Sequence, residues 1–201
     1  YDSSITATAM NGATCSDDGM VFDGVDDFMD LTTWEFGGEP MTVEAYVKYD
    51  AFNSYSRIFD FSNGEADNNV YLSNQDTTDE ARWGIHAGDP DSGKGLLTTP
   101  GFFEAGTWVH AVATVDGTTM KLYKDGALNG TTTDGQTPAN LTRTQHWIGR
   151  SAWSSNGYYD GSIAYLRFWH GEALGADQVA QLYAARNGTT PAMQPCTILG
   201  S

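Results

Sequence analysis

The sequence predicts an all-β fold, an antiparallel two-sheet β-sandwich with one short C-terminal helix. Short segments of alternating polar and apolar residues recur along the chain, and Gly and Asp turns separate them; 23 of the 201 residues are Gly. A helical period is seen once, late in the chain. A length of 201 residues suits a single all-β domain.

Residues 1–19 are small and polar and predict an extended lead-in. The first strands are expected at 20–22 and 28–31, with a turn at Asp23-Gly24 between them. Strict alternation over 42–49 predicts a strand with one buried face. Further short strands are expected at 57–61, 70–72, 82–86, 120–123, 145–149 and 163–170.

The longest predicted strand covers 107–115 and is mostly apolar on both faces, which indicates a central position in a sheet. Asp116-Gly117 and Asp125-Gly126 follow it as hairpin turns. A helix is expected over 176–186, because Val179, Leu182, Tyr183 and Arg186 form one stripe. Asn187-Gly188 supplies its C-terminal stop.

The charge argues against two classes of partner. Lys and Arg number 10 and Asp and Glu number 26, a net charge of −16. This field repels phosphate backbones and anionic lipid, so no nucleic-acid partner is expected. No apolar stretch approaches the roughly 20 residues of a membrane span.

The two cysteines predict an extracellular setting. Cys15 and Cys196 lie near opposite ends, and in a secreted protein they would pair and join the termini; two unrelated thiols are the alternative. Sequons at Asn129, Asn140 and Asn187 also favour a secreted or cell-surface glycoprotein. The chain begins at Tyr1 without a leader, so a mature product or an excerpt of a longer chain is expected.

Several motifs are specific to a known family. Their order and spacing resemble a laminin G-like, concanavalin A-like jelly roll of the pentraxin-related superfamily. The resemblance covers about 20–186 and implies a single domain over 1–201. It also implies a fold that hosts lectins, adhesion modules, pentraxins and glycosidases, so function depends on the site. The motifs are Val21-Phe22-Asp23-Gly24, Met41 to Lys48, Gly106 to Thr114, Leu122 to Gly126, and Tyr159 to Ile163.

The sequence does not predict an enzyme. Retaining glycosidases need two carboxylates about 5 Å apart. The family's catalytic strand is represented here by the fragment Glu65-Ala66-Asp67, and its second Glu is missing. Four histidines occur singly on separate predicted strands and are interpreted as structural: His86, His110, His146 and His170.

Two calcium sites are considered. The pentraxin resemblance implies Asp67 and Asn68 as ligands, in a loop at 63–69 that is rich in oxygen ligands. The family's later acidic run is absent, so one ion is expected there; an Asx-rich turn without metal is the alternative. Asp23 with Asp160 is the second choice, against plain turn chemistry.

A sugar-binding surface is expected on the loop at 150–160. Trp153 and Tyr158 stand there among polar residues, and an exposed ring can stack on sugar C–H groups. Arg150, Asn156 and Asp160 could bind hydroxyls. The alternative is that Trp153 folds back over the open end of the sandwich. We expect this loop and 63–69 to share one rim.

These observations predict an extracellular, non-catalytic module for carbohydrate binding or adhesion, with calcium considered as its cofactor. Its expected partner is a glycan or cell-surface polysaccharide. One alternative is a structural module of a larger extracellular assembly, which binds neighbouring protein modules. A divergent glycoside hydrolase is a further alternative.

Overall fold

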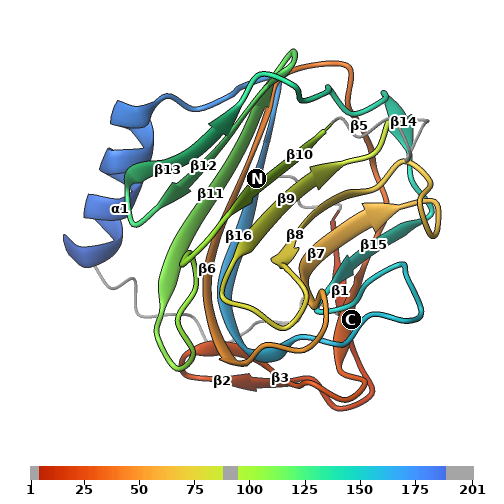
Figure 1. Ribbon diagram of the computed structural model, residues 1–201. Coiled ribbons are helices and arrows are strands. Elements are labelled where there is room, and N and C mark those ends of the chain that lie inside the picture. The colour runs from red at the N-terminus through yellow and green to blue at the C-terminus, as the bar shows by residue number, and fades with distance from the viewer. Residues whose placement is uncertain (1–4, 88–94, 189–201) are drawn as a thin grey trace.

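The computed structural model describes residues 5–87 and 95–188 (Figure 1). In this part of the chain, two seven-stranded antiparallel sheets pack face to face, and helix α1 (Ala176–Gly188) lies outside one of them. This architecture confirms the predicted two-sheet sandwich with one C-terminal helix. No helix in the described ranges has the length and apolar character to cross a bilayer.

We call the two layers sheet I and sheet II. In spatial order, sheet I consists of β1 (Ala7–Met10), β4 (Phe28–Leu31), β15 (Gln145–Ile148), β7 (Arg57–Ser62), β8 (Val70–Asn74), β9 (Ala81–Ile85) and β10 (Leu96–Thr99). Sheet II consists of β13 (Ala127–Thr132), β12 (Thr119–Lys124), β11 (Val109–Asp116), β6 (Met41–Ala51), β16 (Asp160–His170), β3 (Gly19–Asp23) and β2 (Thr14–Ser16). A small ladder pairs β5 (Glu35–Phe36) with β14 (Leu141–Thr142).

The core forms where the inner faces of the sheets meet. Alternation along β8 turns Val70 and Leu72 inward, and alternation along β6 does the same for Val43 and Val47. Trp83 on β9 is fully buried, and its indole N–H donates to the Thr114 carbonyl across the sandwich at 3.2 Å. Each such apolar side chain contributes about 1.5–3 kcal/mol, and this burial holds the two layers together.

Helix α1 covers part of the outer face of sheet II. Val179 is buried against Val112 and Tyr123 of the sheet, and Leu182 packs beside them. The predicted stripe on the helix therefore faces the sheet. Strand β6 differs from its prediction, because Glu44 on its outer face is also fully buried. Helix α1 and the residues just before it lie over part of this outer face, which the alternation of β6 alone predicts to be exposed.

A charged cluster lies on this covered face. One Glu44 oxygen is 2.8 Å from His110 Nε2 and accepts a 3.2 Å hydrogen bond from the Tyr165 hydroxyl. The other oxygen accepts from Arg167 at 3.2 Å. Burial raises the pKa of Glu44, but His110 and Arg167 outweigh burial, so the pKa lies below its ordinary value of 4.5.

The predicted lead-in at 1–19 is wrong in part, since β1 and β2 form there. β1 pairs with β4, and β2 pairs with β3, so each completes one edge of a sheet. β10, which pairs with β9, is likewise an edge strand without a prediction. Short edge strands have one partner and little buried surface, so their sequences carry a weak alternation signal.

Cys15 lies on β2, and Cys196 lies outside the described residues, so their pairing stays a prediction. Asn129 on β13 and Asn140 are exposed, as glycan acceptors must be. Asn187 lies in the last turn of α1. Glycosylation at the three positions stays a prediction.

Candidate functional site

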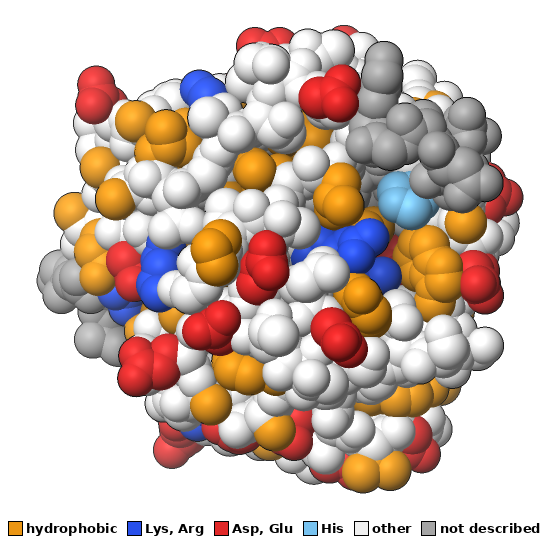
Figure 2. All heavy atoms as spheres, viewed as in Figure 1, with side chains coloured by type: hydrophobic (Ala, Val, Ile, Leu, Met, Phe, Trp, Pro, Cys, Tyr) orange, Lys and Arg blue, Asp and Glu red, His pale blue; other side chains and the backbone are white. Residues whose placement is uncertain are grey.

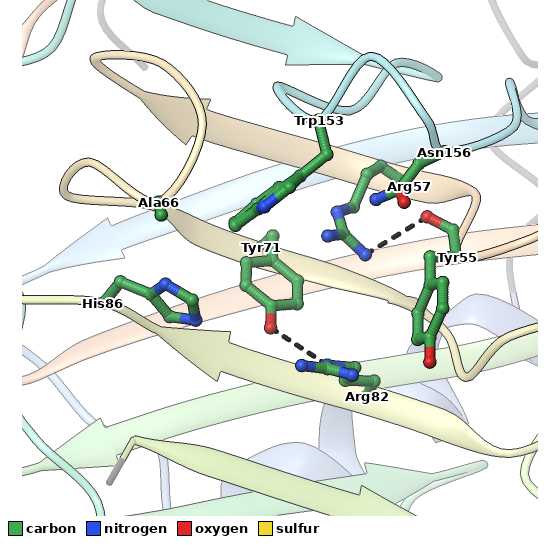
Figure 3. Close-up of a pocket in the computed structure, with 8 residues that line it drawn as sticks. All are labelled: Tyr55, Arg57, Ala66, Tyr71, Arg82, His86, Trp153 and Asn156. Atoms are coloured by element: carbon green, nitrogen blue, oxygen red, sulfur yellow. Dashed lines mark hydrogen bonds between the residues drawn. The ribbon is translucent and has the colours of Figure 1, made fainter. Parts of the chain in front are cut away.

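The outer face of sheet I carries a pocket of about 350 Å³. Figure 2 shows this side of the molecule, where Lys or Arg side chains and a His side chain gather around a hollow bordered by apolar groups. The close-up in Figure 3 shows the lining side chains converging from β7, β8, β9 and the loops beside them. They are Tyr55, Arg57, Ala66, Tyr71, Arg82, His86, Trp153 and Asn156.

Tyr71 forms the floor. Alternation on β8 turns Val70 and Leu72 into the core and Tyr71 outward. Its cross-strand partner on β9 is Gly84, and a Cβ at that position would overlap the Tyr71 ring. The ring therefore lies across β9 in space that the missing side chain leaves. Although it faces outward, Tyr71 is fully buried beneath the groups above it.

Arg57 and Asp60 form a buried pair beside the floor. Arg57 Nε is 3.4 Å from an Asp60 oxygen, and its guanidinium carbon is 4.0 Å from the centre of the Tyr71 ring. Asp60 also accepts from the Asn69 amide and the Ala152 backbone N–H, both at 3.0 Å. Burial raises the pKa of Asp60, and these three partners oppose the rise. The carboxylate positions Arg57 and the loop at 152 rather than facing the pocket.

Arg82 lies at the opposite side of Tyr71. Its Nε donates to the Tyr71 hydroxyl at 3.0 Å, and Nη1 donates to Gln75 Oε1 at 3.0 Å. The guanidinium carbon lies 5.3 Å from the Tyr55 ring centre, within cation–π range. These contacts fix a half-buried cation with part of its fork toward the pocket (Figure 3).

Trp153 overhangs the floor. Its ring meets Tyr71 edge-on at 6.0 Å and His86 at 5.6 Å between centroids. Its backbone N–H donates to Ser151 Oγ at 3.2 Å, and the Asn156 side chain donates to the same oxygen at 3.0 Å. The loop is thus closed by its own hydrogen bonds, and it presents a partly exposed indole.

Two lining residues have strained backbones. Tyr55 has φ of 49° and Ala66 has φ of 58°, in the left-handed region that side chains rarely adopt. Such positions cost roughly 1–3 kcal/mol each and concentrate at functional sites. Both residues lie at the rim of the pocket, so this backbone strain is located at the pocket and not in the core.

The structure brings together two of the five residues predicted to bind sugar, Trp153 and Asn156. Ala66 from the loop at 63–69 lines the same pocket, as the expectation of a shared rim requires. Arg150 lies elsewhere, with its guanidinium carbon 4.0 Å from the Trp147 ring centre. Tyr158 and Asp160 are also outside the lining.

Sequence reasoning missed most of the floor. Strands were predicted at 70–72 and 82–86, but neither Tyr71 nor Arg82 was named as a site residue. Alternation along each strand alone turns these two side chains outward. His86, interpreted as structural, lines the pocket. His110 and His146 are fully buried, as a structural role requires.

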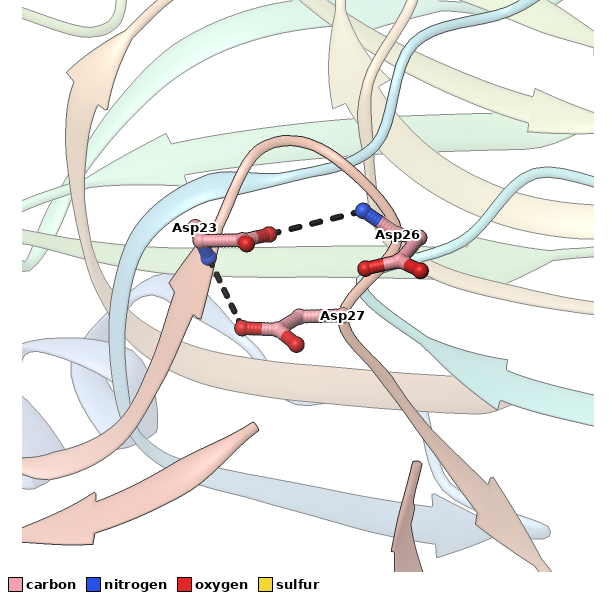
Figure 4. A group of neighbouring side chains, drawn as sticks. All are labelled: Asp23, Asp26 and Asp27. Atoms are coloured by element: carbon pink, nitrogen blue, oxygen red, sulfur yellow. Dashed lines mark hydrogen bonds between the residues drawn. The ribbon is translucent and has the colours of Figure 1, made fainter. Parts of the chain in front are cut away.

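The candidate calcium ligands lie in different surroundings. Asp67 is exposed, and the Asn68 amide donates to it at 2.7 Å. In residues 5–87 and 95–188, one group of three acids brings an oxygen from each to within 4.8 Å of the others: Asp23, Asp26 and Asp27 (Figure 4). Asp160 pairs with Asp23 across the ladder but is not in this group.

Asp27 is the informative member of this acidic group. It is 4% exposed, and its Oδ2 accepts from the Asp23 backbone N–H at 3.0 Å. Its Oδ1 is buried without a hydrogen-bond partner among the described residues. Burial raises its pKa, and Asp23 and Asp26 add to the rise. Three carboxylates with oxygens this close, one of which also carries an unpartnered buried oxygen, fit the ligand chemistry of calcium.

None of the eight lining residues is a carboxylate, so the described part of the pocket contains no acid–base pair of the kind glycoside hydrolysis needs. The site instead combines rings, fixed cations and an amide. It is suited to holding a polar ligand that carries a flat apolar face.

The sequence comparisons define the class of protein. A family model described as the concanavalin A-like lectin/glucanase superfamily, of the laminin G-like type, matches residues 23–180. The chain therefore belongs to this superfamily, which confirms the resemblance drawn from its motifs. No curated protein matches the chain.

Solved structures share the fold at low identity. Domain 4 of AbnA, a GH43 extracellular arabinanase from Geobacillus stearothermophilus, solved with arabinotriose, aligns with a TM-score of 0.66 and 20% identity, covering 89% of this chain and 87% of that one. A pentraxin from Limulus polyphemus aligns at 0.58 and 17%, covering 89% and 81%. Trypanosoma rangeli sialidase aligns at 0.63 and 17%; the match covers 91% of this chain and 30% of the sialidase.

Proposed function

We propose that this chain is a non-catalytic carbohydrate-binding module that works outside the cell and holds a glycan in the pocket on the outer face of sheet I. The observation that carries the proposal is the lining itself. A partly exposed Trp153 stands over a floor of Tyr71, with two guanidinium groups beside it and no lining carboxylate among the described residues.

This combination suits a sugar better than a flat protein surface. Sugar rings have an apolar face that stacks on aromatic rings and hydroxyls that pair with fixed donors. Trp153 supplies the ring, and Asn156 and Arg82 supply donors already oriented by neighbours. Because these groups are held before a ligand arrives, binding costs little side-chain ordering. The likeness to domain 4 of AbnA, which was solved with arabinotriose, supports the same class of ligand.

Calcium is proposed as a structural partner. Asp23, Asp26 and Asp27 would hold it on the connection between β3 and β4, which passes from sheet II to sheet I. When bound there, the cation would neutralise three crowded carboxylates and fix that corner. This assignment replaces Asp67 and Asn68 as our first choice, because the acidic group brings together more carboxylate oxygens.

A glycan array tests the function, with Trp153→Ala as the loss variant. Truncating a central aromatic anchor costs about 2 kcal/mol, so affinity should fall about thirtyfold. The control is Trp108→Ala, which removes a partly exposed Trp that stacks on Tyr46 of sheet II. Unchanged melting temperature must accompany the Trp153 result. Retention of full binding in Trp153→Ala, or no binding to any glycan, would sink the proposal.

A further inference from the structure

The charge of the pocket contrasts with that of the chain. The chain has 26 acidic residues against 10 Lys and Arg, yet the eight lining residues include two Arg and one His and no acid. A random patch of this surface would be acidic. The pocket is therefore a local cationic site on an anionic protein, and Figure 2 shows the cationic groups gathered at the hollow.

The two arginines are not equivalent. The charge of Arg57 is compensated by buried Asp60 at 3.4 Å. Arg82 takes part in none of the ion pairs found within 4.0 Å in the described ranges. Its two hydrogen bonds there go to neutral oxygens of Tyr71 and Gln75. Arg82 thus brings a positive charge to the pocket without a carboxylate in contact.

Only some of the N–H donors of the Arg82 guanidinium make hydrogen bonds within the described residues. A guanidinium has five N–H donors, and hydrogen bonds within the described residues engage one on Nε and one on Nη1. Nη2 and the second hydrogen of Nη1 remain, and together they match the two oxygens of a carboxylate. Tyr55 and Tyr71 hold the group in place, so this geometry exists before a ligand binds.

Resting on the proposed function, we infer that the ligand is an acidic saccharide whose sugar ring carries a carboxylate, as in a uronic acid. The carboxylate would pair with Arg82, and the sugar ring would lie against Trp153. A volume of about 350 Å³ is at the small end of ligand pockets and suits a short segment of an oligosaccharide.

The test measures binding of neutral, uronate and sulfated oligosaccharides to the full chain by array, followed by calorimetry with the strongest uronate and its carboxyl-reduced form. We expect the uronate to bind best, the reduced form to bind at least about tenfold more weakly, and added salt to weaken the uronate alone. Arg82→Gln should abolish the preference. Lys121→Gln, which removes the same charge from β12 of sheet II, should leave it unchanged.

The outcomes separate the two proposals. Equal or stronger binding of neutral sugars overturns the acidic ligand and leaves carbohydrate binding intact. Stronger binding of sulfated sugars overturns the carboxylate. A preference that survives Arg82→Gln overturns the assignment of that residue. No binding to any saccharide removes both proposals.

Discussion

The outer faces of the two sheets carry similar groups, but one face is partly covered and the other is open. Each has a buried acid, an arginine and tyrosine rings. On sheet II, Glu44 meets His110 and the half-exposed Arg167, and α1 lies over part of this face. On sheet I, Asp60 meets Arg57, both are buried, and the face above them is hollow. Similar groups close one surface and leave the other open for a ligand.

The two buried acids differ in the solvent exposure of the arginine that each one pairs with. Arg167 is half exposed and can return to water, so one cationic partner of Glu44 is free to leave it. Arg57 is 3% exposed and has no such escape. The buried Arg57–Asp60 pair beneath the open face is therefore the less easily replaced of the two, as expected where a binding site needs a fixed cation.

The largest effect should come from Asp60→Asn. Asp60 accepts from three donors, so the amide must turn its NH2 toward at least one of them and disrupt the pairing of buried Arg57. We expect the free energy of unfolding to fall by about 3–5 kcal/mol. Glu44→Gln should cost less, about 1–2 kcal/mol, because the half-exposed Arg167 can rehydrate. Urea denaturation of both variants measures the order. Equal costs, or a greater cost for Glu44→Gln, would contradict the comparison.

Calcium should give a smaller stabilisation through the corner that joins the two sheets. At a concentration of about 100 times its Kd, a ligand specific for the folded state adds about 2.7 kcal/mol. We expect calcium to raise the melting temperature by several degrees, and Asp27→Asn to abolish the rise. Asp67→Ala is the matched control and should keep it. Loss of the rise in Asp67→Ala alone would restore the loop at 63–69 as the site.

Acidification should affect the two faces with opposite sign. The pKa of Glu44 lies below its ordinary 4.5, so its stabilisation is present above that pH and is lost as pH falls through the folded-state pKa. The pKa of Asp60 lies above its ordinary 3.8, so its contribution is present below that pH and is lost as pH rises through the folded-state pKa.

Unfolding free energy measured from pH 7 into the acid range tests this. Glu44→Gln should lose stability less steeply on acidification than the natural chain, and Asp60→Asn more steeply. Each single group changes the slope by at most about 1.4 kcal/mol per pH unit. Parallel curves for the three proteins would show that the two carboxyls do not differ as described.

Interior strands were predictable because packing against a second sheet imposes period 2 on them. Edge strands such as β1 and β10 were not, because pairing on one side leaves little pattern. The burial of Glu44 was also outside local alternation, since His110 of β11 and Tyr165 of β16 contact it from other parts of the chain. Such contacts depend on strand pairing, which the sequence of β6 alone does not encode.

The site shows the same limit. Trp153 and Asn156 could be chosen because rings and amides in a Gly-containing loop are unusual in a core. Arg57 could not, because a β-bulge between Arg57 and Phe59 determines its face. Tyr71 and Arg82 were within reach of alternation alone. What remained hidden was their registry across neighbouring strands, which requires the pairing to be known.

Gly84 gives the pocket its depth because it has no Cβ, and the Tyr71 ring occupies that space. One methyl group there would tilt the Tyr71 ring toward the opening and shift the guanidinium anchored to its hydroxyl. A ligand could then be refused without alteration of any group that touches it. A glycine at this position of β9 is thus a simple means by which the scaffold gains a cavity.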